Sequence, residues 1–126
     1  MSSDSLNILF VDDDALARKV VARQLAALGH EVTPLASGAE ALDALAEETQ
    51  LLISDVRMPG MEGPELARRV REKRPDIPIL FITGFADHRL LRAMEGLNCH
   101  MLPKPFDRKQ LSAAVDEAVS LEAPQD

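Results

Sequence analysis

Five polar residues of this chain have the side chains that phosphoryl transfer requires: Asp12, Asp13, Asp55, Thr83 and Lys104. Carboxylates that lie together repel one another, and a divalent cation relieves that repulsion. Mg²⁺ prefers oxygen ligands and is therefore the metal that such a cluster would hold. A carboxylate beside the metal can attack phosphorus and carry the group as an aspartyl phosphate, while a hydroxyl and an ammonium bind the phosphoryl oxygens.

Each of these residues closes or follows a short apolar segment of the sequence. The segments are continuously apolar rather than alternating, which is typical of strands buried on both faces. We therefore expect strands over residues 7–11, 32–35, 51–54, 79–83 and 99–102.

Segments with apolar residues at helical spacing follow the expected strands. The first begins after Asp14 and should end at Gly29, which suits the end of a helix. The second should begin with Ser37 as its N-cap and place Leu42 and Leu45 on its inner face. Further helices are expected around residues 66–70, ending before Pro75, then over 87–95 and over 111–119.

Five strands alternating with helices predict an α/β fold with a doubly wound parallel sheet, flavodoxin-like, in the strand order 2-1-3-4-5. Ligands of such sheets bind outside the carboxyl ends of the strands. Alone, each polar residue has an ordinary explanation, as a helix cap, a strand residue or a solvated lysine. Their coincidence at the ends of different strands favours a common site instead.

The balance of charges excludes several classes of function. The chain has 14 Lys and Arg against 21 Asp and Glu, so its net charge is −7. We expect no direct nucleic acid binding and no membrane insertion, because the chain lacks both a basic excess and a long apolar run. The single cysteine, Cys99, forms no internal disulfide. Together with the absence of a signal sequence, this favours a cytoplasmic protein.

The chain resembles the receiver domain of two-component response regulators from about Asn7 to Val119. ILFVDDD resembles the first acidic motif of that family, and LLISDVRMPGMEG resembles the phosphoacceptor strand and its loop. ILFITG resembles the strand that carries a Thr or Ser, and LPKPF resembles the lysine motif. The resemblance implies a CheY-like (βα)₅ fold and a single receiver domain over residues 1–126, with its core at about 7–120 and frayed ends.

The resemblance also implies a role for each residue of the site. Asp55 would accept the phosphoryl group, and Thr83 and Lys104 would bind it. In such domains the peptide bond between this lysine and the next residue, here Lys104–Pro105, is typically cis.

The implied cofactor of this family is Mg²⁺. Asp13 would bind the ion directly and Asp12 through water, with Asp55 as a further ligand. Arg57, two residues beyond the phosphoacceptor, would contribute its backbone carbonyl.

One position departs from the family pattern. Receivers often carry Tyr or Phe three residues before the lysine, and this chain has Met101 there. A flexible Met can fill a gap that Thr83 leaves when it shifts inward, but the usual coupling between threonine and aromatic ring is then in question. The implied output face, formed by the fourth helix, fifth strand and fifth helix, includes Arg89, Arg92, His100, Met101 and Lys109.

We therefore predict a phosphorylation-activated switch rather than an enzyme acting on other substrates. Its phosphodonor would be a histidine kinase or a phosphotransfer protein, and its output an unknown downstream protein target. If the chain forms a homodimer, the face of helix 4, strand 5 and helix 5 is the contact that we expect.

Three alternatives remain at this point. A receiver-like module could bind its partner without being phosphorylated. An aspartate-nucleophile phosphohydrolase of the haloacid dehalogenase type would use Asp12 and Asp14 as a D-x-D motif, but Leu16 stands where that motif has Thr or Val. A flavodoxin-like cofactor carrier is disfavoured, because the aspartates after the first strand would repel a phosphate and the chain has no Trp or Tyr.

Overall fold

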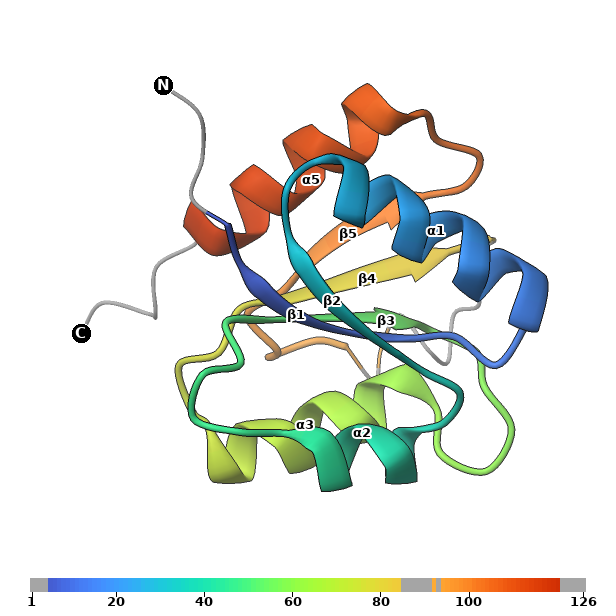
Figure 1. Ribbon diagram of the computed structural model, residues 1–126. Helices are drawn as coiled ribbons and strands as arrows, with labels where there is room; N and C mark the ends of the chain where they lie inside the picture. The colour runs from blue at the N-terminus through green and yellow to red at the C-terminus, as the bar shows by residue number, and fades with distance from the viewer. Residues whose placement is uncertain (1–4, 85–91, 93, 121–126) are drawn as a thin grey trace.

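The five predicted strands form one parallel sheet in the order β2-β1-β3-β4-β5, as the sequence indicates. A computed structural model describes residues 5–84, 92 and 94–120 of the chain (Figure 1). Each strand lies within one residue of its predicted bounds. The strands are β1 (Asn7–Val11), β2 (Glu31–Leu35), β3 (Leu51–Asp55), β4 (Ile79–Thr83) and β5 (His100–Pro103).

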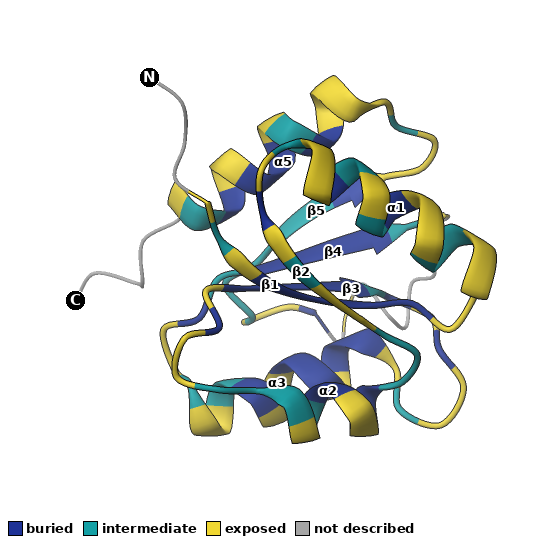
Figure 2. Ribbon diagram, in the orientation of Figure 1, coloured by how far each residue is buried: buried dark blue, intermediate teal, exposed yellow. Residues whose placement is uncertain are grey.

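Helices cover both faces of the sheet (Figure 1). Helices α1 (Ala15–Ala27) and α5 (Arg108–Ser120) lie on one face, and α2 (Gly38–Ala44) and α3 (Gly63–Lys73) lie on the other. Successive residues of a strand point to opposite faces. Ile8 accordingly packs in the core under α1 and α5, and Leu9 packs in the core under α2 and α3. The central strands are thus buried on both sides (Figure 2).

The predicted helix boundaries follow from local capping. Asp14 is the N-cap of α1, and its carboxylate accepts hydrogen bonds from the N–H groups of Leu16 and Ala17. Gly29 follows the end of this helix with a φ of +99°, a conformation that favours glycine. Ser37 caps α2 through the N–H of Glu40 at 3.2 Å, as predicted.

Helix α2 is shorter than the sequence pattern indicates. We expected Leu45 on its inner face, but the helix ends at Ala44 and Leu45 has an extended backbone. The apolar side chain of Leu45 still packs against the core, so the periodicity reported burial correctly and helix length incorrectly. Tertiary packing satisfies such a residue equally well outside a helix.

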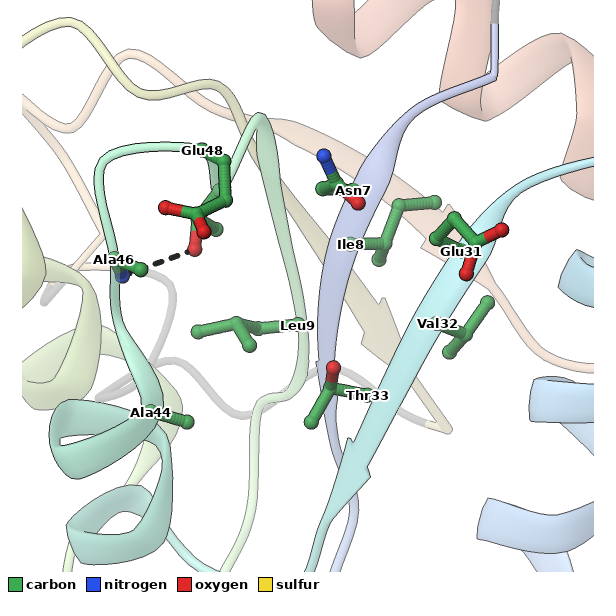
Figure 3. A pocket seen from close by; sticks show the side chains of 10 residues that line it. Asn7, Ile8, Leu9, Glu31, Val32, Thr33, Ala44, Ala46 and Glu48 are labelled. Carbon is green, nitrogen blue, oxygen red and sulfur yellow. Dashed lines mark hydrogen bonds between the residues drawn. The ribbon is translucent and has the colours of Figure 1, made fainter.

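The early end of α2 leaves a crevice of about 250 Å³ beside β1 and β2 (Figure 3). Leu9, Thr33, Ala44 and Glu48 are among the residues that line it. The crevice extends to Asn7, the first residue of β1, and so lies toward the opposite end of the strands from the predicted site.

The helix that we expected over residues 87–95 lies largely outside the described residues. Arg92 is helical, and Met94 is buried against the core under α2 and α3. In the part of the chain that the structure describes, no helix has the length and apolar character needed to cross a bilayer.

Candidate functional site

Three carboxylates meet at the carboxyl end of the sheet. Asp12 and Asp13 directly follow β1, and Asp55 is the last residue of the neighbouring strand β3. One carboxylate oxygen from each of the three residues lies within 4.8 Å of the others. Asp12 is buried, Asp55 is half-buried and Asp13 is exposed, so the cluster opens to solvent on the Asp13 side. These are the three side chains that the sequence proposed as metal ligands.

The loop after β1 is held by hydrogen bonds around Asp12. The backbone N–H of Asp12 donates a hydrogen bond to the carbonyl of Leu35 at 3.0 Å. The Asp12 carboxylate accepts one from the N–H of Asp14 at 2.9 Å. The Arg18 guanidinium donates a hydrogen bond to the backbone carbonyl of Asp12 at 2.7 Å. These hydrogen bonds hold the acidic segment, residues 12–14, in a defined shape without any ligand.

Burial raises the pKa of both Asp12 and Asp55. At Asp12 the N–H of Asp14 opposes the rise, while the negative charge of Asp55 adds to it. At Asp55 the Lys104 ammonium and the N–H groups of Val56 and Arg57 oppose the rise of the pKa. Gathering these charges therefore costs free energy in the ligand-free protein, and a bound cation would offset that cost.

Thr83 and Lys104 lie at the same edge of the sheet. Thr83 ends β4, and its carbonyl accepts a hydrogen bond from the N–H of Lys104 at 2.9 Å. The Lys104 ammonium is 3.8 Å from a carboxylate oxygen of Asp55. The peptide bond between Lys104 and Pro105 is cis, as the family resemblance implied. The loop after β5 therefore brings the Lys104 ammonium close to the carboxylate of Asp55, the candidate phosphoacceptor.

A cleft of about 170 Å³ joins these groups. It is small, and half of its six lining residues are ones that the sequence placed at strand ends. The lining residues are Asp55, Val56, Arg57, Thr83, Gly84 and Lys104.

The sequence did not reveal the part that Gly63 plays. Gly63 is the last residue of LLISDVRMPGMEG, the segment that resembles the phosphoacceptor strand and its loop. Its N–H donates to the Val56 carbonyl at 2.8 Å, and a Cβ there would stand 2.5 Å from the Asp55 carbonyl oxygen. The loop after β3 can therefore close over the strand end only with glycine. The position of Gly63 eight residues after Asp55 is not a signal that composition or periodicity could supply.

The predicted switch and output residues are described only in part. Met101 is half-buried and packs against the core under α2 and α3, so it is not an exposed contact residue. It pairs with Phe81 across β4 and β5, and Thr83 lies two residues further along on the same face. Arg92 is exposed, and Arg89 lies outside the described residues.

Two other residues of the predicted output face are described. Lys109 is exposed on α5, and His100 on β5 lies 2.8 Å from the carboxylate of Glu117 on α5.

The parallel sheet and the acid cluster at its carboxyl edge define a receiver domain. The sequence pattern of the response regulator receiver domain family matches residues 8–116, so the chain belongs to this family. The fold and family that the sequence indicated are therefore confirmed.

Individual relatives place the chain among two-component proteins. It is 39% identical over 119 residues to the sensor kinase CckA of Brucella abortus, covering 91% of this chain and 13% of that protein. It is 38% identical over 112 residues to the response regulator receiver protein CpdR of Brucella abortus, covering 87% of this chain and 93% of CpdR. The crystal structure of the receiver domain from the hybrid histidine kinase CckA aligns with a TM-score of 0.74 at 38% identity, over 90% of this chain and 99% of that one.

Proposed function

We propose that this receiver domain accepts a phosphoryl group on Asp55 from the phosphohistidine of a histidine kinase or phosphotransfer protein, and that the reaction depends on Mg²⁺. The observation that carries the proposal is the meeting of Asp12, Asp13 and Asp55 within 4.8 Å, with Lys104 3.8 Å from Asp55. The domain acts as a cytoplasmic signalling switch and not as an enzyme with other substrates.

In the transfer, a carboxylate oxygen of Asp55 forms a bond to phosphorus while the bond between phosphorus and the donor imidazole nitrogen breaks. Asp12, Asp13, Asp55 and the backbone carbonyl of Arg57 would hold Mg²⁺. When bound, the ion supplies positive charge that stabilises the phosphoryl oxygens.

The remaining charge of the transferred group is balanced by this chain's own residues. The Lys104 ammonium leaves Asp55 for a phosphoryl oxygen, a short movement because the two groups already lie 3.8 Å apart. The Thr83 hydroxyl donates a hydrogen bond to another phosphoryl oxygen from the neighbouring strand. Both contacts exist only after transfer, so they favour the phosphorylated state.

The phosphorylated state would reach the downstream target through the face of helix 4, β5 and α5. A shift of Thr83 toward the phosphoryl group vacates space on the sheet face that also carries Met101. Met101 can move into that space because its side chain is unbranched and flexible. The resulting change at β5 would alter binding to a protein target or to a second copy of the chain.

The first turns of α1 supply a docking surface for the phosphodonor. Leu16 and Val20 are 73% and 48% exposed, and they lie four residues apart on one face of the helix. The helix contains Arg18, Lys19 and Arg23 but no acidic residue, although the whole chain carries a net charge of −7. An apolar surface with acidic residues at its rim would complement this helix next to the acid cluster.

The phosphohydrolase alternative is disfavoured by the position of Asp14. A D-x-D nucleophile motif needs both acids in the site, but the Asp14 carboxylate caps α1 through Leu16 and Ala17. The carboxylates that gather are those of Asp12, Asp13 and Asp55 instead.

Intact-mass spectrometry after incubation with acetyl phosphate tests the proposal. We expect one phosphoryl adduct in the presence of Mg²⁺, and none with EDTA or in Asp55→Asn. Beryllofluoride binding, followed by NMR, is the second readout. Absence of both the adduct and beryllofluoride binding would favour the phosphorylation-independent binding module.

A further inference from the structure

Arg18 contacts the backbone of the acidic segment. Its Nη1 donates a hydrogen bond to the Asp12 carbonyl oxygen at 2.7 Å. From this contact we infer that Arg18 is a positioning residue for the Mg²⁺ site, and that it holds the peptide between Asp12 and Asp13 so that the Asp13 carboxylate faces the metal. The inference rests on the proposed function and adds a residue to it that contributes no metal ligand.

The peptide unit explains how a contact to Asp12 acts on Asp13. The carbonyl of Asp12 and the amide of Asp13 form one plane, so fixing the carbonyl restricts the direction in which Asp13 leaves the chain. Asp12 is also held by the Leu35 carbonyl and by the N–H of Asp14. Asp13 is exposed, and its side chain is the one that needs orientation from the backbone.

The start of α1 places Arg18 where it can make this contact. The backbone N–H of Arg18 donates to the Asp14 carbonyl at 2.8 Å, so Arg18 lies one turn into a helix that Asp14 caps. Helical side chains lean toward the N-terminus, and the guanidinium therefore reaches back over that turn. Arg18 is half-buried, and a hydrogen bond from a charged donor is stronger than one between neutral groups.

The charge of Arg18 gives this inference a direction that can be tested. By Coulomb's law alone, a cation near a Mg²⁺ site repels the ion, so removing the Arg18 charge should tighten Mg²⁺ binding. Loss of positioning should weaken Mg²⁺ binding, because the ligands must then be ordered when the metal binds. The two effects have opposite signs.

The test is calorimetric titration of Mg²⁺ into the whole chain and its variants. Arg18→Gln removes the charge and the guanidinium, and Arg18→Lys keeps the charge on a side chain without the planar fork. Arg23→Gln is the matched control, because Arg23 is an exposed residue of the same helix and loses the same charge. Thermal unfolding with EDTA measures the stability of each variant without the metal, and ¹⁵N relaxation of the Asp13 amide measures its order.

We expect Arg18→Gln to weaken Mg²⁺ binding about tenfold, the lower end of the loss when a residue that orients metal ligands is removed. Arg23→Gln should bind Mg²⁺ as tightly as the wild type or more tightly. The Asp13 amide should become more mobile in Arg18→Gln without metal. If Arg18→Gln does not fold, Arg18→Lys takes its place, with a smaller loss in the same direction.

Mg²⁺ binding by the Arg18 variant that is equal to or tighter than that of the wild type would overturn the inference alone. A wild type that does not bind Mg²⁺ would overturn the proposed function as well, so the two failures are distinguishable.

Discussion

Gly63 lies so close to Asp55 that a Cβ on the glycine would stand 2.5 Å from the Asp55 carbonyl oxygen. The same Cβ would meet the Phe81 ring at 3.0 Å and the Val56 Cα at 3.1 Å. Two of these three neighbours are backbone atoms, which cannot turn aside as a flexible side chain could. The end of β3 and the start of α3 can approach this closely only because Gly63 has no side chain.

Gly63→Ala should therefore destabilise the domain by about 1–3 kcal/mol, the usual cost of overpacking a buried site. It should also slow phosphorylation by acetyl phosphate, because the carbonyl that must give way belongs to Asp55, the proposed phosphoacceptor. Thermal unfolding and intact-mass time courses measure the two effects. Gly84→Ala is the control for stability, since a Cβ there meets nothing closer than Lys104 Cδ at 3.9 Å. Equal stability of the two variants would contradict the role assigned to Gly63.

The raised pKa values of Asp12 and Asp55 predict an unusual pH dependence of stability. The folded, metal-free domain binds the carboxyl protons of Asp12 and Asp55 more tightly than the unfolded chain does. The contribution of both groups to stability therefore decreases as pH rises from 3.8, their ordinary pKa, through the raised values. Above that window both carboxylates are ionised, and each destabilises the fold.

Asp12→Asn should accordingly raise the midpoint of thermal unfolding at about pH 7 in EDTA, and the gain should shrink as pH falls toward the ordinary carboxyl pKa. Adding Mg²⁺ should stabilise the wild type more than the variant, since the ion offsets the same repulsion. Asp43→Asn, at an exposed position of α2, is the control. A gain at Asp12 that does not change with pH would point to packing rather than ionisation as its cause.

The sequence predicted the sheet well because continuous apolar runs report strands that are buried on both faces. It also located the acid cluster, since the rule that ligands bind at the carboxyl ends of parallel strands needs only the strand order. Asp12 and Asp55 are far apart in the sequence, but β1 and β3 are neighbours in the sheet. Topology alone was enough to bring their carboxylates together.

The remaining features depend on single contacts that no periodicity encodes. Helix α2 ends at Ala44, although Leu45 continues the helical pattern, because Leu45 packs against the core from an extended backbone. The need for glycine at position 63 follows only from its close approach to the Asp55 carbonyl oxygen. Nothing in the sequence pattern singles out Arg18, and its role follows only from the hydrogen bond that it donates to the Asp12 carbonyl.

An unsatisfied buried oxygen on α1 predicts a stabilising substitution. The buried Oε1 of Gln24 has no hydrogen-bond partner among the described residues. Gln24→Met keeps the length and helix propensity of the side chain and removes the polar atoms, so it should stabilise the domain by about 1 kcal/mol. Chemical unfolding followed by circular dichroism measures the change.

Gln110→Met is the matched control for this substitution. The Gln110 amide oxygen accepts a hydrogen bond from the Asp107 N–H at 2.9 Å at the start of α5. The same chemical change should therefore destabilise the domain there. If both substitutions shifted stability in the same direction, the missing partner of Gln24 would not be the cause.

Mutation of the exposed apolar residues of α1 should slow phosphoryl transfer from a protein donor but not from a small-molecule donor. Leu16→Ser with Val20→Ser should lower the kcat/KM of transfer from a phosphohistidine-bearing protein by roughly tenfold or more, because truncating an interface anchor commonly costs over 1 kcal/mol. Phosphorylation by acetyl phosphate should not change, since a small donor enters the cleft without docking on the helix. Ala39→Ser, at an exposed position of α2, controls for an added surface hydroxyl. The protein donor should be one that phosphorylates the wild type, and equal slowing of both donors would show that the substitutions disturb the acid cluster rather than a docking surface.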